Sequence, residues 1–290
     1  MDMDRGRSPM VRRRPPRLTR SMTILVLGAT GKTGRRVVGR LRDEGEKVLA
    51  ASRSGEVRFD WSEPDSWTAP LAEADAVYLI APDDPAPVSP FVARAVASGV
   101  RRLVVLSGRG IEHTGGRFGH GMSAAEDAVR AAGVDWTIIR ANNFDQNFDE
   151  DLWHAPLLAG RLALPIGAVG ESFIDAEDVA DVAAALLTRD GHAGQIYELS
   201  GPRAITFAEA VAAIAAASGR TIEYAELTPQ AYEDELLAAG YPAAVATELG
   251  VMFELMRTGT NTPPTDGVQR VLGRPARDFE SYVDRVWHRK

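Results

Sequence analysis

Runs of apolar residues alternate with segments of helical period over the first half of the chain. The apolar runs cover residues 23–27, 47–52, 57–60, 76–81, 103–107 and 136–140, and the helical segments between them include 33–44, 91–98 and 124–132. Strands that alternate with helices at this spacing form βαβ units, and a strand that is apolar throughout is buried on both faces. The pattern therefore predicts an α/β fold, a doubly wound parallel sheet with helices on both faces.

The second half of the chain has a different pattern. Asp175 fits the N-cap of a helix over residues 176–188, a strand follows over 195–200, and Thr206-Phe-Ala-Glu209 is a capping box that opens another helix. A strand over 221–227, helices over 229–239 and 243–257, and a loop over 258–267 come next. Residues 142–172 are irregular and rich in Asn, Phe, Gly and Pro, which is typical of a segment over a ligand site. We expect one domain over 22–141 and a smaller C-terminal lobe over 142–290, with residues 173–200 returning to the main sheet.

The composition is that of an ordinary globular protein, and it excludes several kinds of site. The 290 residues are 45% hydrophobic and 25% charged, and they include no cysteine. Disulfides, thiolate metal sites and a cysteine nucleophile are therefore excluded. No apolar run approaches the roughly 18 residues that a membrane-spanning helix needs. We expect no membrane partner.

Charge is distributed unevenly along the chain. The net charge is −7, but residues 1–20 contain seven Arg against two Asp, so this tail carries +5 and the remainder −12. An acidic body argues against nucleic acid as a partner. Residues 1–21 have no apolar face, which predicts a disordered basic tail, either a nucleic-acid arm or, as we prefer, an upstream start before a natural Met22. No secretory signal follows the tail, and we expect a cytoplasmic protein.

A glycine-rich loop joins the first predicted strand to the first predicted helix. Its sequence is Gly28-Ala-Thr-Gly31-Lys-Thr-Gly34. In this strand–turn–helix context the glycines permit a tight turn and close packing, and the helix N-terminus binds a pyrophosphate. A Walker A loop is excluded because Val26 stands where that loop needs its first glycine. We expect a dinucleotide to be held at Gly28, Thr30, Gly31, Lys32, Thr33 and Gly34.

The end of the second strand distinguishes between the two nicotinamide cofactors. A protein that binds NAD carries Asp or Glu there, whereas this chain has Ala51-Ser52-Arg53-Ser54 and no carboxylate before Glu56. A guanidinium group and hydroxyl groups suit the 2′-phosphate of NADP(H). Lys32 and Arg35 add positive charge. We therefore predict NADP(H) as the cofactor, with Ser52 and Arg53 at its extra phosphate.

Several motifs together resemble a known family. They are Val26-Leu-Gly-Ala-Thr-Gly-Lys-Thr-Gly34, Ser52-Arg-Ser54, Phe59-Asp-Trp61, Ala76-Val-Tyr-Leu79, Ser107-Gly-x-Gly110, Ala132-Gly-Val-Asp-Trp136, Phe173-Ile-Asp-Ala-Glu-Asp178 and Thr265-Asp-Gly-Val-Gln-Arg-Val-Leu-Gly-Arg-Pro275. From Met22 onward the chain resembles the NmrA-like branch of the atypical short-chain dehydrogenases/reductases, and it is similar to the group that contains agroclavine and festuclavine dehydrogenases. The resemblance implies a Rossmann-type fold that binds NADP(H). It also implies that Asp60 lies near the adenine, Ala81 and Pro82 near the ribose, Ser107 near the nicotinamide, and Asn143 and Phe144 at the substrate pocket.

The chain departs from the commoner members of that superfamily at the catalytic pair. Short-chain dehydrogenases use a Tyr that protonates the substrate and a Lys four residues later that lowers the pKa of the Tyr. The matching positions hold Met122 and Glu126, and no Tyr-x-x-x-Lys occurs in the chain. The absence of the pair is compatible with the resemblance, because the NmrA-like branch includes iminium and quinone reductases and non-catalytic redox sensors.

These observations give one leading function and two alternatives. We expect an NADPH-dependent reductase that delivers hydride to an electrophilic C=N, C=C or quinone group of a hydrophobic small molecule in secondary metabolism. The alternatives are a non-catalytic NADP-binding redox sensor of NmrA type and a reductase-fold protein that catalyses a non-redox rearrangement or cyclisation.

Candidate catalytic and substrate residues remain after the cofactor loop. His113 and His120 follow the fifth strand, so that either is a candidate proton donor or an exposed loop residue. Glu126 either orients a cationic substrate group or is a first-turn helix carboxylate. Met122 and Asn143 are candidate pocket residues, and Phe144, Phe148 and Trp153 form either an apolar wall for a polycyclic substrate or the core of the lobe. No third ligand accompanies the two histidines, so we expect no metal.

Overall fold

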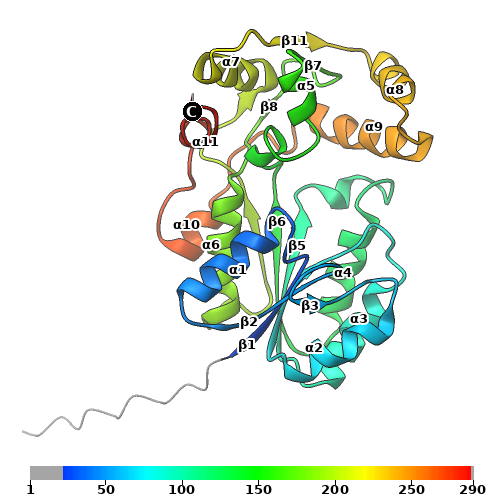
Figure 1. Cartoon of the computed structure of the whole chain (residues 1–290), viewed down its shortest axis with the longest axis vertical. Coiled ribbons are helices and arrows are strands. Elements are labelled where there is room, and N and C mark those ends of the chain that lie inside the picture. The colour runs from blue at the N-terminus through cyan, green and yellow to red at the C-terminus, as the bar shows by residue number, and fades with distance from the viewer. Residues whose placement is uncertain (1–21, 289–290) are drawn as a thin grey trace, which may run out of the picture.

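The main body of the protein is a seven-stranded parallel sheet (Figure 1). The computed structural model describes residues 22–288, and the predicted basic tail, residues 1–21, lies outside them. The strands are β1 (Thr23–Leu27), β2 (Lys47–Ser52), β3 (Val57–Arg58), β4 (Ala76–Ile80), β5 (Arg102–Gly108), β6 (Asp135–Ala141) and β9 (Gln195–Leu199). Their order is β3-β2-β1-β4-β5-β6-β9, and every neighbouring pair is parallel. The strand order reverses between β1 and β4, which is where open α/β sheets bind their ligands.

Helices cover both faces of this sheet (Figure 1). One face carries α1 (Gly34–Asp43), α6 (Ala176–Thr188) and α10 (Gly267–Leu272), and the other carries α2 (Thr68–Glu73), α3 (Val88–Ala97) and α4 (His120–Arg130). Successive side chains of β1 point to opposite faces of the sheet. Ile24 and Val26 pack into the core on the first face, and Leu25 and Leu27 pack into the core on the second. All four are fully buried, which explains why the strand is apolar throughout.

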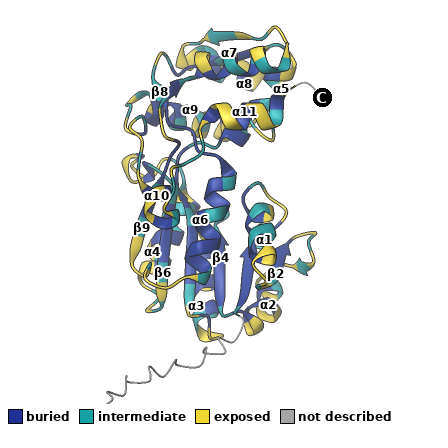
Figure 2. Cartoon of the chain, turned by 90° about the vertical axis from the view of Figure 1, so that its left-hand side faces the viewer, coloured by how far each residue is buried: buried dark blue, intermediate teal, exposed yellow. Residues whose placement is uncertain are grey.

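A second lobe stands beyond the carboxyl ends of the strands (Figures 1 and 2). It contains α5 (His154–Leu158), β7 (Arg161–Leu164), β8 (Gly170–Glu171), β10 (Ile205–Thr206), α7 (Phe207–Ser218), β11 (Glu223–Glu226), α8 (Pro229–Ala238), α9 (Ala243–Arg257) and α11 (Phe279–Trp287). Strand β7 pairs with β11 in parallel and β8 pairs with β10 in antiparallel orientation. Short 3₁₀ helices η1 (Pro64–Trp67), η2 (Ile111–His113) and η3 (Asp145–Asn147) lie in the connections. The lobe has its own aromatic core, centred on Phe148.

The predicted α/β fold with a doubly wound parallel sheet is confirmed. Strands β1 and β2 and helices α6 and α9 have the predicted bounds. Asp175 caps α6 by accepting a hydrogen bond from the Glu177 N–H, and the capping box of α7 is formed. Strand β9 pairs with β6 at the edge of the main sheet.

Some elements differ from the prediction. Helix α4 begins at His120, four residues earlier than expected. Gly121 in its first turn packs against the Pro82 carbonyl, where a Cβ would lie 1.7 Å from the oxygen. Glycine has a low helix propensity, so a helix that has glycine in its first turn is hard to detect from the sequence. Residues 142–172 contain η3, α5, β7 and β8 rather than irregular structure alone. These elements are too short for their periodicity to show in the sequence.

No helix within residues 22–288 combines the length and the apolar character needed to cross a membrane. The same residues contain no group of His, Cys, Asp and Glu side chains arranged to hold a metal ion.

Candidate cofactor and substrate site

The glycine-rich loop makes a tight turn between β1 and α1. Gly28 has φ of 62°, and the Gly31 N–H donates to its carbonyl at 2.8 Å. A Cβ on Gly34 would lie 2.1 Å from the same carbonyl oxygen, so only glycine lets the helix begin this close to the strand. The N-terminus of α1 therefore faces the end of β1, which is the arrangement that binds a pyrophosphate.

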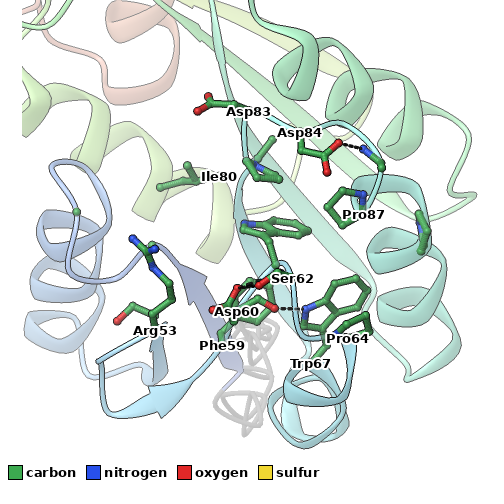
Figure 3. A pocket seen from close by; sticks show the side chains of 18 of the residues that line it. Arg53, Phe59, Asp60, Ser62, Pro64, Trp67, Ile80, Asp83, Asp84 and Pro87 are labelled. Carbon is green, nitrogen blue, oxygen red and sulfur yellow. Dashed lines mark hydrogen bonds between the residues drawn. The ribbon is translucent and has the colours of Figure 1, made fainter. Parts of the chain in front are cut away.

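The first pocket lies along the carboxyl ends of β1, β2 and β4 (Figure 3). Its volume is about 1030 Å³, at the upper end for small-molecule sites. Eight of the predicted cofactor residues line it, namely Gly28, Thr30, Gly31, Ser52, Arg53, Asp60, Ala81 and Pro82. In Figure 3, Arg53 stands on one side of the pocket and Pro64 and Trp67 on the other.

The residues at the two sides suit the two ends of an adenosine phosphate. The Ser52 Oγ is buried and has no hydrogen-bond partner within residues 22–288, which leaves it free for a ligand beside the exposed Arg53. At the opposite wall, Trp61 packs edge to face with Phe59 and Trp67. Trp67 is fully buried, whereas the partly exposed Trp61 offers an apolar surface that fits a purine. The chain thus fits a dinucleotide with a 2′-phosphate.

The carboxylate of Asp60 is held ionised at this wall. The Ser62 hydroxyl and backbone N–H donate to its Oδ1 at 2.7 and 2.9 Å, and these hydrogen bonds lower the pKa of Asp60. An ionised carboxylate accepts hydrogen bonds but cannot donate them, so it suits an amino group or a ribose hydroxyl of the ligand.

A second pocket of about 480 Å³ adjoins the first and is mostly apolar. Ile80 and Ala81 at the end of β4 line both pockets, so the two share a wall. The apolar residues of the second pocket are Leu106, Ile111, Phe118, Met122, Phe144, Leu152, Leu249, Met252, Leu255 and Met256. Four of these come from α9 in the second lobe. The pocket therefore lies between residues at the strand ends of the sheet and residues of that helix.

Ser107 is fixed at the floor of the second pocket by a buried ionic cluster. Its Oγ donates to the Glu126 Oε1 at 2.7 Å, and the guanidinium groups of Arg140 and Arg130 donate to the same carboxylate at 2.6–2.9 Å. Burial opposes ionisation of Glu126, but the hydrogen bonds from Arg140 and Ser107 outweigh it and lower the pKa of the carboxyl group. The Ser107 hydroxyl thus donates its hydrogen bond to Glu126, and its lone pairs can accept hydrogen bonds from a ligand in the pocket.

A cluster of polar residues also lines the second pocket. It contains Asn142, Asn143 and Asn261 together with Arg109, whose Nη1 donates to the Pro263 carbonyl at 2.8 Å. Behind it, the Asn143 amide donates to the buried Glu171 at 3.3 Å. Burial raises the pKa of Glu171 to about 7.

A model of the NAD(P)H-binding family matches residues 28–190, more than half of the chain. This protein belongs to the NAD(P)H-binding family. The (4-alkanoyl-5-oxo-2,5-dihydrofuran-3-yl)methyl phosphate reductase of Streptomyces griseus is 36% identical over 274 residues, which are 89% of this chain and 96% of the relative. The NAD(P)H azoreductase of Xenophilus azovorans is 31% identical over 279 residues, 90% of this chain and 96% of the relative.

The expected resemblance to NmrA-like and clavine-related proteins is also confirmed. Festuclavine synthase II of Penicillium roqueforti is 28% identical over 287 residues, 92% of this chain and 99% of the relative. The NADPH complex of the Escherichia coli quinone oxidoreductase QOR2 superposes with a TM-score of 0.78 at 20% identity, over 91% of this chain and 100% of that one. NmrA in complex with NAD superposes with a TM-score of 0.72 at 16% identity, over 92% of this chain and 95% of that one. Identities this low show a shared fold.

In this NAD(P)H-binding protein, most of the predicted site residues lie at the two pockets. Ser107, Met122, Asn143 and Phe144 line the second pocket. Lys32 lines it too, away from the predicted 2′-phosphate position, and Arg35 pairs instead with Glu150. Thr33 and Gly34 are buried under the loop, and their role is to shape the turn.

Five other predicted site residues lie outside both pockets. His113 ends η2 and His120 begins α4, and both are exposed. Glu126 is buried behind Ser107 with both oxygens bonded to arginines and to Ser107, so it is unavailable to orient a substrate cation. Phe148 and Trp153 are fully buried and pack on each other at 4.8 Å between ring centroids. Of the two alternatives that the sequence left open for these two rings, the structure shows the core of the lobe and not a wall of the pocket.

Sequence reasoning missed the contribution of α9. Its Leu249, Met252 and Met256 line the second pocket, although the sequence predicted only a helix there. The pattern of a helix shows which positions are apolar but not which neighbour covers them.

Proposed function

We propose that this protein is an NADPH-dependent reductase that delivers hydride to an electrophilic C=N, C=C or quinone group of a hydrophobic small molecule. The observation that supports this best is the wall shared by the two pockets at Ile80 and Ala81. A small molecule in the apolar pocket lies next to one end of a dinucleotide in the first. Holding two reactants side by side is a large part of what a hydride-transfer enzyme contributes.

The residues of the first pocket account for cofactor binding. The turn at Gly28 and Gly31 and the start of α1 bind the pyrophosphate, and Ser52 and Arg53 bind the 2′-phosphate. Beyond the shared wall, at the second pocket, the Ser107 lone pairs accept from the nicotinamide carboxamide, because Glu126 already takes the hydroxyl proton. When bound, the reduced nicotinamide supplies a hydride from its C4.

The substrate class follows from the second pocket. Its walls are aliphatic, thioether and aromatic, with polar groups at two sides, which suits a compact and largely apolar molecule. The activities of two relatives, an azoreductase and a dihydrofuranyl methyl phosphate reductase, support the reduction of small organic acceptors. Similarity to festuclavine synthases supports the further proposal that the substrate is a secondary metabolite.

NADPH consumption by the full chain tests the proposal. We expect oxidation of NADPH with at least one class among cyclic imines, quinones and enones. Met252→Arg places a charge inside the apolar pocket and should abolish turnover while NADPH still binds. Leu237→Arg, on the exposed surface of α8, is the matched control and should keep full activity. Absence of turnover with all three classes despite tight NADPH binding contradicts the proposal.

The missing Tyr-x-x-x-Lys favours a second candidate, a non-catalytic NADP-binding redox sensor of NmrA type. A sensor binds NADP⁺ and NADPH with different affinities and leaves NADPH unconsumed with every acceptor. Calorimetric titration with both forms, run beside the turnover assay, separates the two candidates.

A further inference from the structure

Lysine is rare in this chain. Only three of its 33 Lys and Arg residues are Lys, at positions 32, 47 and 290. An Arg guanidinium group keeps its proton in proteins, whereas a Lys ammonium group can release one. The lysine in the glycine-rich loop is therefore a cation of a kind that the chain seldom uses.

Lys32 connects the two pockets. It follows Gly31, which lines the first pocket, and its own side chain lines the second and is 17% exposed. Its Nζ donates to the Asp151 Oδ2 at 2.8 Å and to the Asn147 Oδ1, and it lies 5.5 Å from the centroid of the Phe144 ring. These contacts hold the ammonium group at the wall of the apolar pocket.

Few other groups at the second pocket can supply a proton. Within residues 22–288, the charged side chains that line it are Lys32, Arg109 and Asp151. Arg109 donates to Glu198 and to backbone carbonyls, and a guanidinium group does not serve as an acid in proteins. Asp151 is 60% exposed and accepts from Lys32. The Ser107 proton is committed to Glu126.

We propose that the Lys32 ammonium group is the general acid of the reductase and protonates the oxygen or nitrogen on which negative charge develops as the acceptor is reduced. This inference rests on the proposed reductase function and adds the proton donor to it. Asp151 orients the ammonium group and, being exposed, connects it to water.

The atoms and electrons balance for each class of acceptor. A quinone receives one hydride to become a hydroquinone monoanion, then an N–H bond of Lys32 breaks as an O–H bond forms, and the neutral amine regains a proton from water beside Asp151. An enone receives hydride at its β-carbon, and its enolate oxygen takes the Lys32 proton. A cyclic iminium ion needs hydride alone, since its nitrogen keeps the electron pair of the C=N bond and becomes neutral.

Comparison of these acceptors with Lys32→Met tests the proposal. Quinone and enone reduction should fall about 100-fold or more, as for loss of a general acid, while iminium reduction stays near the wild-type rate. Lys47→Met is the matched control, because Lys47 forms a similar ion pair with Glu73 at 2.9 Å but lies outside both pockets. It should leave all three rates unchanged.

A second variant distinguishes proton donation from positive charge alone. Lys32→Arg keeps the charge but cannot give up a proton, and we expect it to reduce quinones as slowly as Lys32→Met. Quinone rates restored by arginine would overturn the proposal, as would equal losses with quinone and iminium acceptors.

A binding measurement without cofactor tests the same group independently of turnover. 4-Nitrophenol absorbs visible light only as its phenolate, and the ammonium group should favour that form in the pocket of the full chain. Wild-type protein should increase the phenolate fraction, and Lys32→Met should not. An equal effect of both proteins would contradict the role of Lys32. A wild-type protein that stabilises the phenolate but reduces no acceptor class would instead refute the reductase function, while still showing that the Lys32 cation acts on a ligand in the pocket.

Discussion

Arg53 takes the position at which a protein that binds NAD carries an acidic residue. It is exposed at the end of β2 and lines the first pocket beside Ser52, whose buried hydroxyl has no partner within residues 22–288. Both side chains donate hydrogen bonds, and the guanidinium group adds charge, so together they match phosphoryl oxygens.

Replacement of Arg53 should change the choice of cofactor. We expect Arg53→Ala to weaken NADPH binding about 10- to 100-fold, the range for a lost charge-assisted hydrogen bond, and to leave NADH binding unchanged. Calorimetric titration with both cofactors measures this. Arg42→Ala, which removes an exposed ion pair with Glu56, should affect neither. Equal weakening of NADPH and NADH by Arg53→Ala would contradict the assignment.

Glu171 makes stability depend on pH. Burial raises its pKa to about 7 from 4.5, so the folded protein binds this proton more tightly than the unfolded chain. The contribution to stability is therefore present at low pH and is lost as the pH rises from about 4.5 to about 7.

The variant Glu171→Gln should remove that dependence, because an amide mimics the protonated carboxyl group. At about pH 8 we expect it to be more stable than wild type by up to about 3 kcal/mol, and at about pH 5 by less than about 1 kcal/mol. Urea unfolding at both pH values provides the free energies of unfolding. A difference that stays constant with pH would show that Glu171 is ionised in the folded protein throughout.

Two glycines of α1 occupy opposite environments within one element. A Cβ on Gly34 would meet the Gly28 carbonyl at 2.1 Å, while one on Gly39 meets nothing within 4 Å. We expect Gly34→Ala to destabilise the protein by about 2 kcal/mol or more and to abolish NADPH binding. Gly39→Ala should stabilise it by up to about 1 kcal/mol through helix propensity and leave binding intact.

Thermal unfolding and NADPH titration of the two variants measure both effects. A change in unfolding temperature of the same sign in both variants would mean that close packing at the start of α1 does not shape the loop.

The elements of the main sheet could be predicted from sequence because their signals are local. A strand such as β1 is apolar at every position because both of its faces are buried, and the Asp175 cap and the α7 capping box satisfy backbone groups within a few residues. The cofactor loop was predicted for the same reason, since its glycines are required by the turn itself.

The substrate side could not be predicted to the same extent, because it depends on contacts between distant segments. Phe144 and Phe148 are four residues apart in the sequence, yet Phe148 lies in the core and Phe144 lines the pocket. Leu249 of helix α9 lines the same pocket as Phe144, although more than 100 residues separate the two in the sequence. Nothing in its period of apolar positions specifies that partner.

At the scale of the whole molecule, the cofactor loop and the second lobe are joined by ion pairs. Lys32 bonds to Asp151, and Arg36 bonds to Glu150 at 2.7 Å, so the beginning of α1 holds the chain segment that leads into the lobe. The lobe in turn contributes α9 to the lining of the apolar pocket. The two parts thus make one site, with the cofactor cradle in the sheet domain and the substrate cover in the lobe.

This arrangement predicts direct hydride transfer from the cofactor to the acceptor, and isotope transfer tests it. The full chain is incubated with a cyclic iminium acceptor and NADPH deuterated at C4, each of the two C4 stereoisomers in turn, and the product is examined by mass spectrometry. We expect one carbon-bound deuterium in the product with one isomer and none with the other. Consumption of no NADPH, or a reduced product without deuterium from either isomer, would contradict the account.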